Sequence, residues 1–406
     1  MKYIVLLGDG MADYPVPELG NKTPLQAARK PNMDYLASKG LAGMVHTIPA
    51  NLPPGSDVAN LSVLGYDPVK YYTGRSPLEA ISMGVPMAAE DTAFRTNLVT
   101  LSEAENYEDR IMLDHSSDEI SSDEAALLME EVKKHFENDF LSFYTGVSYR
   151  HCLLWKKGPA DFELTPPHDI VDKKIASYLP KGKNSEVLLK MMEESTRFLA
   201  SHPVNQERVR RGLRPANSIW IWGQGRKPAL PSFYEKYGVK GAVISAVDLV
   251  KGIGLCAGME SIDVEGATGN LHTNYAGKAE AALNALKDGY DFVYIHVEAP
   301  DECGHRNEIE NKVRAIELID ELVLGTIIKG MEGYEDYKIM LLPDHPTPLS
   351  LRTHTRDPVP FAIYRKSKEK TGPARAYDEF SAMKSGIVYR NGQELMSEFL
   401  KEVKDQ

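Results

Sequence analysis

The chain has 406 residues, which is enough for two or three domains of roughly 100–200 residues each. Its hydrophobic content of 42% and charged content of 26% are typical of a globular protein with an ordinary core. The net charge of −11 argues against a nucleic-acid-binding protein, because such proteins usually carry a basic stripe. The three cysteines form no C-x-x-C pair, which argues against a disulfide framework and indicates a reducing compartment.

The N-terminal segment does not have the pattern of a targeting signal. Its apolar run, residues 3–7, is too short for the core of a signal peptide and is soon followed by an aspartate. No apolar stretch approaches the roughly 20 residues that a membrane-spanning helix needs. We therefore expect a cytoplasmic protein that acts on neither membranes nor nucleic acids, and the oligomeric state stays open.

Short β-branched runs along the chain predict strands that are buried on both faces, as in a parallel sheet. They lie at residues 3–7, 241–247, 292–298, 338–342 and 361–364. Helical patterns lie between these strands. Residues 23–26 have the sequence of a capping box, which starts a helix, and Gly40 would end a helix over residues 31–39. Strands that alternate with helices predict an α/β core with a mostly parallel sheet flanked by helices.

Residues 90–215 have a different pattern, which predicts a smaller α+β domain inserted into the core. Its strands are expected at 94–101 and 149–155, and its helices at 122–136 and after Ser185. The core would then consist of residues 1–89 and 216–406.

Aspartates follow three of the predicted core strands: Asp9, Asp301 and Asp344. Ligands of open α/β sheets bind outside the carboxyl ends of the strands, so these carboxylates are expected to converge. Three histidines accompany them in the sequence: His305, His345 and His354. An aspartate after a strand is often only a turn former, but three of them with histidine partners favour a metal site.

Mixed carboxylate and imidazole ligands suit Mn²⁺, Zn²⁺, Co²⁺ or Fe²⁺ better than Ca²⁺. Three carboxylates and three imidazoles are more than one ion normally takes from a protein. Two ions about 3.5–4 Å apart would use them, and such pairs are common in phosphoryl-transfer sites.

Ser56 is the candidate nucleophile. It follows a Pro-Pro-Gly bend and opens a helix-like run, where the helix N-terminus would stabilise an anion. Serine is also a preferred N-cap for purely structural reasons, so its position alone does not decide between the two roles.

Eight segments in chain order make the pattern specific. They are LGDGMAD, PPGSDVANLSVLGYDP, YTGRSPLEA, SYRH, WGQGR, GATG, DECGH and LPDHPTP. The ordered set, over nearly the whole chain, resembles the archaeal-type cofactor-independent phosphoglycerate mutases of the alkaline-phosphatase-like superfamily of metalloenzymes. The resemblance implies an alkaline-phosphatase-like core and a glycolytic isomerase that interconverts 3-phosphoglycerate and 2-phosphoglycerate without 2,3-bisphosphoglycerate.

The resemblance also implies residue roles. One metal would be held by Asp9, Ser56, Asp344 and His345, with Ser56 as the residue that is transiently phosphorylated. The second metal would be held by Asp301, His305 and His354. The resemblance implies two divalent cations, and we expect Mn²⁺, with Zn²⁺, Co²⁺ or Mg²⁺ as alternatives.

Arginine forks suit both the phosphoryl group and the carboxylate of such a substrate. Arg150 with His151 on the inserted domain, and Arg226 in the core, are expected to bind it, whereas Arg75 is a weaker candidate that is better explained by a surface ion pair. An inserted domain that caps the metals would hold glycerate while it turns. It would also exclude water, which would otherwise hydrolyse phosphorylated Ser56.

One departure from the family pattern leaves other activities open. The chain reads Arg306-Asn307 after DECGH, where Asp-Gly is typical of many archaeal members. Similar bacterial proteins have been proposed as homoserine kinases, so a homoserine kinase or related small-molecule phosphotransferase at the same metal site is the alternative. A phosphohydrolase and a catalytically silent binding protein are further alternatives.

Overall fold

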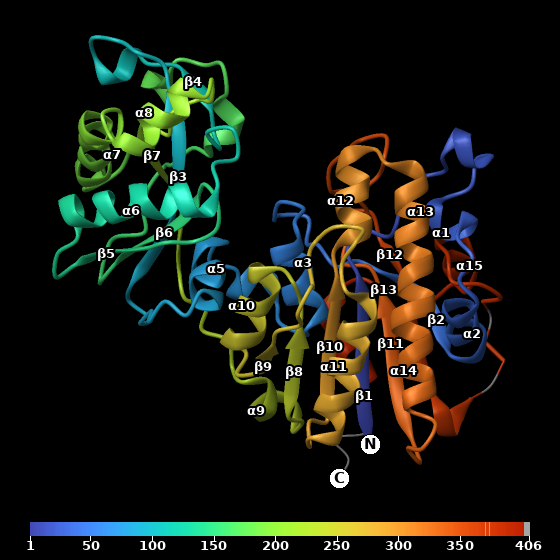
Figure 1. Ribbon diagram of the computed structural model, residues 1–406. Coiled ribbons are helices and arrows are strands. Elements are labelled where there is room, and N and C mark those ends of the chain that lie inside the picture. Colours follow the sequence, from blue (N-terminus) through green and yellow to red (C-terminus); the bar gives the residue numbers. More distant parts are fainter. Residues whose placement is uncertain (370, 373, 402–406) are drawn as a thin grey trace. The chain divides into compact units, whose positions relative to one another are not determined.

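The computed structural model describes residues 1–369, 371–372 and 374–401. It contains two compact units, a larger one formed by Met1–Tyr72 and Ala229–Gln406 and a smaller one formed by Thr73–Pro228 (Figure 1). In the described part of the chain, every helix is too short or too polar to cross a bilayer.

The larger unit is built on an eight-stranded sheet of order β13-β2-β12-β11-β1-β10-β8-β9. Its strands are β1 (Lys2–Gly8), β2 (Leu41–Val45), β8 (Gly241–Ile244), β9 (Glu260–Ile262), β10 (Phe292–Val297), β11 (Tyr337–Leu342), β12 (Val359–Arg365) and β13 (Val388–Tyr389). The five strands from β11 to β9 are parallel, and β12 runs antiparallel to both of its neighbours. The prediction of a mostly parallel α/β sheet is therefore confirmed.

The register of the three central strands aligns their carboxyl ends. Leu7 of β1 lies opposite His296 of β10 and Leu342 of β11. All three strands are buried along their central residues, as their continuous apolar sequences predict. The residues that follow them therefore emerge at one edge of the sheet.

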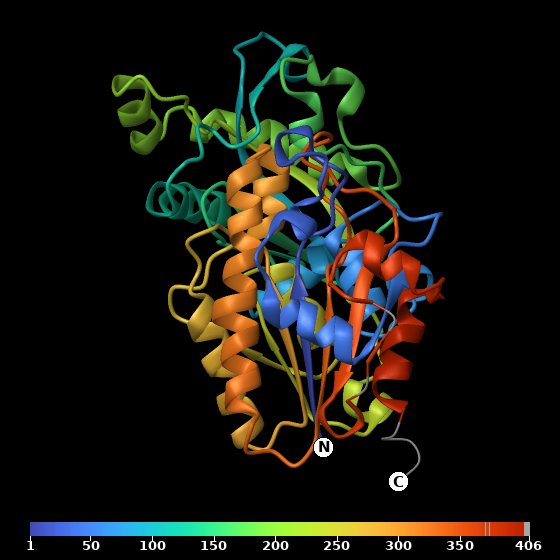
Figure 2. The ribbon, with the colours of Figure 1, turned by 90° about the vertical axis from the view of Figure 1, so that its right-hand side faces the viewer.

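Helices cover both faces of this sheet. They are α1 (Pro24–Ala27), α2 (Pro31–Lys39), α3 (Ser56–Val63), α4 (Pro68–Tyr71), α9 (Phe233–Tyr237), α10 (Asp248–Cys256), α11 (Tyr275–Lys287), α12 (Ala299–Arg306), α13 (Ile309–Leu318), α14 (Gly325–Gly330), α15 (Glu379–Lys384) and α16 (Gly392–Phe399), with short turns η1 (Pro17–Leu19) and η6 (Lys366–Lys368). A π-helical turn, η5 (Ile319–Leu324), joins α13 to α14, and Figure 2 shows the three as one continuous rod.

The two faces have different helix partners. Alternate strand residues such as Ile4, Leu6 and Ile295 share one apolar core with α2, α11 and the α13–α14 rod. On the other face, the Tyr3 ring lies 5.7 Å from that of Phe399 in α16, and α3 packs against α10 and α16. The capping box predicted at the start of α1 is present, because Thr23 and Gln26 exchange their hydrogen bonds.

The smaller unit is an antiparallel five-stranded sheet with its own core. Its strands are β3 (Thr92–Leu101), β4 (Met112–Asp114), β5 (Leu141–Tyr144), β6 (Arg150–Trp155) and β7 (Ser218–Arg226), and its helices are α5 (Ser76–Ser82), α6 (Ser122–Phe136), α7 (Ser185–Leu199) and α8 (Pro203–Arg210), with turns η2 (Tyr107–Asp109), η3 (Pro167–Ile170) and η4 (Ile175–Tyr178). Strand β3 is central and pairs with β6 and β7. Helices α6 and α7 supply Leu128 and Met192 to the core beneath it.

The smaller unit extends beyond the range 90–215 that the sequence suggests for the inserted domain. Helix α5 packs on β3 and β7, and β7 is itself a strand of the smaller sheet. Contacts made across the sheet therefore assign residues 73–89 and 216–228 to this unit, whereas local sequence patterns do not contain that information.

Candidate active site

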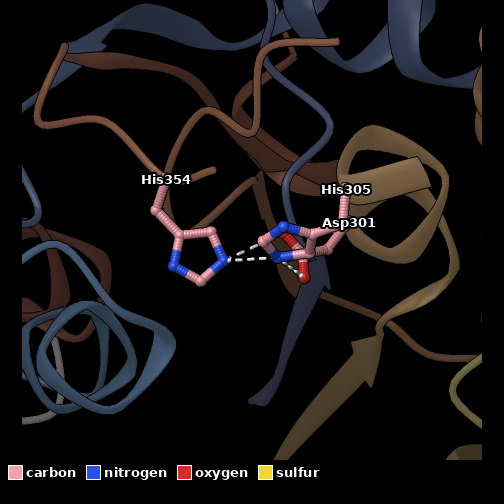
Figure 3. A group of neighbouring side chains, drawn as sticks. All are labelled: Asp301, His305 and His354. Carbon is pink, nitrogen blue, oxygen red and sulfur yellow. Dashed lines mark hydrogen bonds and ion pairs between the residues drawn. The ribbon is translucent and has the colours of Figure 1, made fainter. Parts of the chain in front are cut away.

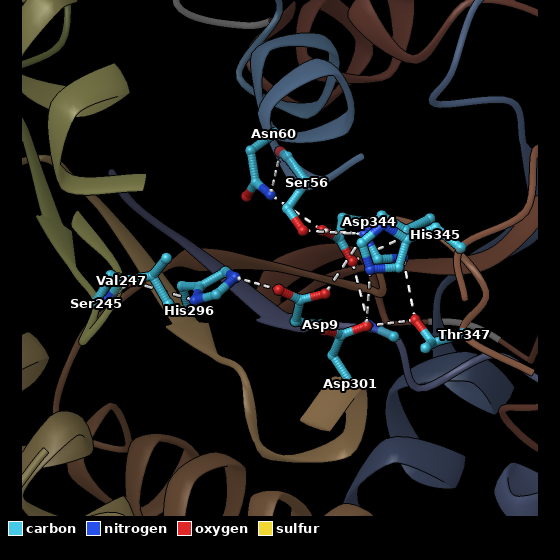
Figure 4. A network of polar contacts seen from close by, with 12 residues as sticks. Asp9, Ser56, Asn60, Ser245, Val247, His296, Asp301, Asp344, His345 and Thr347 are labelled. Atoms are coloured by element: carbon cyan, nitrogen blue, oxygen red, sulfur yellow. Dashed lines mark hydrogen bonds and ion pairs between the residues drawn. The ribbon is translucent and has the colours of Figure 1, made fainter. Parts of the chain in front are cut away.

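Four segments of the larger unit bring candidate side chains to the carboxyl edge of the parallel strands (Figure 4). Asp9 follows β1, Asp344 and His345 follow β11, and Asp301 lies in the first turn of α12, just after β10. Ser56 is the first residue of α3. Gly55 is the N-cap residue of that helix and no side chain caps it, so the Ser56 hydroxyl has no capping role.

The first cluster, which we call the Ser56 group, contains Asp9, Ser56, Asp344 and His345. His345 Nε2 lies 3.0 Å from Ser56 Oγ, 3.3 Å from Asp344 Oδ2 and 3.6 Å from Asp9 Oδ1. The two aspartates and the histidine are buried, whereas Ser56 is partly exposed. His345 Nε2 thus lies within 3.6 Å of a potential ligand atom from each of the other three residues.

The second cluster, which we call the Asp301 group, contains Asp301, His305 and His354 (Figure 3). Asp301 Oδ2 lies 3.2 Å from His305 Nε2, and Asp301 Oδ1 lies 3.3 Å from His354 Nε2. The two imidazole Nε2 atoms are only 2.9 Å apart. His305 is held by its other nitrogen, Nδ1, which lies 2.9 Å from the carbonyl oxygen of Arg352.

The chemistry of both clusters fits divalent cations. Asp9 Oδ1 is buried and has no hydrogen-bond partner, which is unfavourable for a carboxylate oxygen unless a cation approaches it. Asp9, Asp301 and His345 offer ligand atoms within 4.8 Å of one another, so the two clusters adjoin. Carboxylates together with imidazoles form a donor set that suits divalent ions such as Mn²⁺ and Zn²⁺.

Electrostatics support the same conclusion. Burial, followed by the charges of Asp344 and Asp301, raises the pKa of Asp9 well above its ordinary value. Burial alone would also raise the pKa of Asp301, but hydrogen bonds with His305 and His354 outweigh it and the pKa is lowered. Hydrogen bonding to Asp301 raises the pKa of His305 to about 9. The carboxylates therefore need positive charge close to them.

Asn60 is a supporting residue that the sequence analysis missed. Its amide nitrogen donates to Asp344 Oδ2 at 3.0 Å and to the Ser56 carbonyl at 2.8 Å. Its amide oxygen accepts from the hydroxyl of buried Tyr294 at 2.6 Å. The sequence does indicate this contact, because residues four apart lie on the same face of a helix and Asn60 follows Ser56 at that spacing.

Gly10 and Thr347 complete the setting. Gly10 has a φ of +63°, and a Cβ atom there would come within 2.6 Å of Thr347 Oγ1 and 2.8 Å of Asp301. Its N–H donates to Asp344 Oδ1 at 3.1 Å, and the Thr347 hydroxyl donates to Asp301 Oδ1. The Gly-Asp-Gly sequence predicts a tight turn that requires glycine at position 10. The role of Thr347 depends on the path of its loop, which sequence patterns do not reveal.

His296 lies beside Asp9 at the end of β10 and was also missed. Its Nε2 is 3.1 Å from Asp9 Oδ2, and its side chain is completely buried. Burial lowers its pKa to about 3. A single histidine inside an apolar strand has no motif that distinguishes it from a core residue.

Two of the predicted substrate-binding residues do not have the expected environment. Arg150 begins β6 and is exposed, but the next residue, His151, points to the opposite face and is buried. His151 Nδ1 accepts from the N–H of Gly146 at 3.1 Å, and burial lowers its pKa to about 3. Strand alternation thus turns His151 into the interior, and the prediction that it contacts a ligand is not supported by this conformation.

Arg226 was expected in the core, but it is the last residue of β7 in the smaller unit. It lies opposite Thr92 of β3, whereas Arg150 lies opposite Asn97. Five residues of strand separate these positions by about 17 Å. Arg226 donates to the Gly158 carbonyl at 3.3 Å and does not converge with Arg150.

Arg150 has other cationic neighbours within the smaller unit. The guanidinium of Arg95 lies 4.8 Å from the Trp222 ring and pairs with Glu79 at 3.0 Å. Burial lowers the pKa of Arg95, and the positive charges of Arg75 and Arg150 lower it further. Arg75 also pairs with Glu79, at 2.8 Å, so this cluster has three guanidinium groups and one carboxylate.

Comparisons with known proteins identify the family of this chain. The family model of 2,3-bisphosphoglycerate-independent phosphoglycerate mutase matches residues 37–205. A probable enzyme of this name from Geobacter sulfurreducens is 51% identical over 98% of this chain and the whole of the relative. The enzyme of Methanosarcina mazei is 50% identical over 99% of this chain and the whole of the relative. The solved cofactor-independent phosphoglycerate mutase from Thermoplasma acidophilum is 28% identical, covers 99% of both chains and aligns with a TM-score of 0.65. As the order of its motifs predicts, the chain belongs to the 2,3-bisphosphoglycerate-independent phosphoglycerate mutases, a family of isomerases.

Proposed function

We propose that this protein interconverts 3-phosphoglycerate and 2-phosphoglycerate through a phosphorylated Ser56. The observation that carries the proposal is the position of Ser56 Oγ, 3.0 Å from His345 Nε2 among the buried carboxylates of the Ser56 group. Relatives that are 50% and 51% identical over nearly the whole chain have this enzyme's name, which supports the same substrates.

We further propose that the Ser56 group and the Asp301 group each hold one divalent cation, with Mn²⁺ as the first candidate and Zn²⁺, Co²⁺ or Mg²⁺ as alternatives. When bound, such cations lower the pKa of a serine hydroxyl and offset the negative charge of phosphoryl oxygens. The partnerless Asp9 Oδ1 and the close approach of His305 to His354 support these sites.

The transfer takes two balanced steps at Ser56. Ser56 Oγ loses its proton and attacks phosphorus, the bond from phosphorus to glycerate O3 breaks, and O3 gains a proton. Glycerate then turns, its 2-hydroxyl loses a proton, and the O2 oxygen attacks the phosphorus of phosphorylated Ser56. The bond from phosphorus to Ser56 Oγ breaks, and Ser56 Oγ recovers a proton. Ser56 begins α3, where the positive end of the helix dipole favours the phosphoserine anion.

The smaller unit is proposed to hold glycerate during this turn. Arg150 remains the candidate, and Arg95 and Arg75 are added because the positive charges of Arg150 and Arg75 both act on Arg95. A guanidinium fork suits the substrate carboxylate, and Glu79 fixes two of the three arginines in place. The capping role predicted for the inserted domain stays a proposal, which this basic cluster supports.

The departure at Arg306-Asn307 does not favour the kinase alternative. Asn307 has a φ of +56° and is the C-cap residue of α12. Glycine and asparagine are the residues that adopt this left-handed conformation most easily. Asn307 therefore replaces the glycine of the family pattern for a conformational reason, and the position gives no information about the phosphoryl acceptor.

A glycolytic role in the cytoplasm is part of the proposal. The described cysteines, Cys152, Cys256 and Cys303, form no disulfide, which fits the reducing compartment that the sequence predicts.

The test is incubation of Mn²⁺-loaded protein with 3-phosphoglycerate, without 2,3-bisphosphoglycerate, followed by ³¹P NMR. We expect 2-phosphoglycerate to appear, and phosphorylated Ser56 to be recovered after acid quenching. Protein that holds two cations per chain but forms no 2-phosphoglycerate would contradict the proposal. A parallel sample with ATP and homoserine identifies the kinase, and release of inorganic phosphate identifies a phosphohydrolase.

A further inference from the structure

A chain of hydrogen bonds lies on the side of Asp9 opposite His345 (Figure 4). Ser245 Oγ lies 3.2 Å from His296 Nδ1, and His296 Nε2 lies 3.1 Å from Asp9 Oδ2. All three side chains are buried. They come from the carboxyl ends of β8, β10 and β1, which are adjacent in the sheet, so strand order alone places the three residues in a row.

The Asp9 carboxylate sets the direction of this chain, because the oxygens of an ionised cation ligand only accept hydrogen bonds. The N–H of Val247 donates to Ser245 Oγ at 3.0 Å, and the Ser245 hydroxyl proton is available for His296 Nδ1. A neutral imidazole whose Nδ1 accepts has its proton on Nε2, and that N–H then donates to Asp9 Oδ2. The opposite tautomer would place two acceptor atoms against each other at 3.1 Å, which is unfavourable.

The two oxygens of Asp9 therefore have different environments. Oδ2 accepts from His296, whereas Oδ1 has no hydrogen-bond partner and lies 3.6 Å from His345 Nε2. The Asp9 backbone is fixed as well, because its N–H donates to the Val297 carbonyl at 2.9 Å. The Asp9 carboxylate can then only rotate, and the hydrogen bond that His296 donates to Oδ2 restricts this rotation.

We infer that His296 and Ser245 are a positioning pair that holds Asp9 with a single oxygen, Oδ1, turned toward the cation of the Ser56 group. The inference rests on the cation proposed there and goes beyond it, because it assigns His296 to the support of a ligand. Partners of this kind orient a metal ligand, and their loss typically weakens metal binding by roughly 10–100-fold.

A direct ligand role is the competing interpretation of His296. Asp9, His296 and Asp344 offer three ligand atoms within 4.8 Å of one another, which one ion could also span. The two interpretations differ in what Nε2 supplies. A positioning residue supplies an N–H, whereas a ligand supplies a lone pair.

The experiment compares the variants His296→Ala, His296→Gln and Ser245→Ala with the wild-type protein. A glutamine amide reaches about as far as Nε2 and donates an N–H, but its nitrogen cannot bind a metal. Co²⁺ is titrated into protein freed of metal, and each step is followed by its visible absorption spectrum. The Asp301 group serves as an internal reference, because none of the variants touches it. Ser195→Ala is the matched control, since Ser195 is a fully buried serine of the smaller unit that donates to a carbonyl.

We expect His296→Ala to weaken cation binding at the Ser56 group by roughly 10–100-fold and to leave the affinity of the Asp301 group for the second cation unchanged. His296→Gln should restore most of the affinity with a spectrum like that of the wild type, and Ser245→Ala should cause a smaller loss. Equal losses in the alanine and glutamine variants, with an altered spectrum, would make His296 a ligand and overturn the inference. Unchanged affinity in His296→Ala or in Ser245→Ala would also overturn it. Wild-type protein that binds no cation at the Ser56 group would instead contradict the proposed function.

Discussion

Replacement of Glu379 by glutamine should change how the stability of the protein depends on pH. Glu379 is the first residue of α15, and its carboxylate is buried. One oxygen accepts from the Asp13 N–H at 3.0 Å and the other from the Thr23 hydroxyl at 2.7 Å. Despite these hydrogen bonds, burial raises its pKa to about 7.

The size of the effect follows from the two pKa values. The ordinary pKa of a glutamate is 4.5, and that of Glu379 in the folded protein is about 7. The difference of about 2.5 pKa units corresponds to roughly 3 kcal/mol in the free energy of unfolding. A carboxyl group with a raised pKa binds more protons in the folded state than in the unfolded state between these values. Its ionisation therefore costs stability as the pH rises from 4.5 through about 7. Glutamine cannot ionise, so Glu379→Gln should be within about 1 kcal/mol of the wild type near pH 5 and up to about 3 kcal/mol more stable near pH 8.

The assay is urea unfolding at several pH values between 5 and 8, with EDTA present so that metal binding adds no pH dependence of its own. The tryptophans Trp155, Trp220 and Trp222 all lie in the smaller unit, so their fluorescence follows that unit, whereas circular dichroism follows both. The change should appear in the dichroism transition that belongs to the larger unit. Glu310→Gln, at an exposed position, is the control. A stability difference that stays constant across this pH range would refute the reasoning.

Three further predictions concern single side chains. Ser56→Ala should lower kcat by a factor on the order of 10⁴ or more with an unchanged dichroism spectrum, and turnover near the wild-type rate would exclude Ser56 as the nucleophile. Lys312→Met should destabilise the larger unit by about 3–5 kcal/mol in urea unfolding. The Lys312 ammonium is completely buried and 2.7 Å from Asp13, whose charge would lose its partner, so wild-type stability would contradict this pairing. Arg208→Met should lower the stability of the smaller unit by about 2–3 kcal/mol, measured by tryptophan fluorescence, because Arg208 is buried against Glu124.

The larger unit was largely predictable because its strands are locally encoded. Residues 31–39 form the predicted helix without a shift in either end, and the strand expected at 292–298 is β10 within one residue. Both segments have an apolar pattern that is complete within the segment. The expected order of strand, turn and aspartate then located the edge where Asp9, Asp301 and Asp344 emerge.

Long-range contacts account for what the sequence did not provide. Arg226 follows a Gly-Gln-Gly turn pattern, yet pairing with β3 makes the whole segment a strand of the smaller unit. The burial of His151 depends on the elements that pack against its face of β6, which also bury Leu153. In each case the deciding residues are distant in the sequence.

The candidate ligands and the candidate arginines belong to different units of the chain. All residues of the Ser56 group and the Asp301 group lie in the larger unit, and Arg75, Arg95 and Arg150 lie in the smaller one. Cation content therefore reports on the larger unit alone, since the smaller unit supplies none of the proposed ligands. A variant that keeps two cations but binds glycerate weakly would have its defect in the arginine cluster. A variant that loses one cation would have its defect at the strand edge, and His296 would then be the first residue to examine, because its side chain contacts the Asp9 carboxylate from the neighbouring strand.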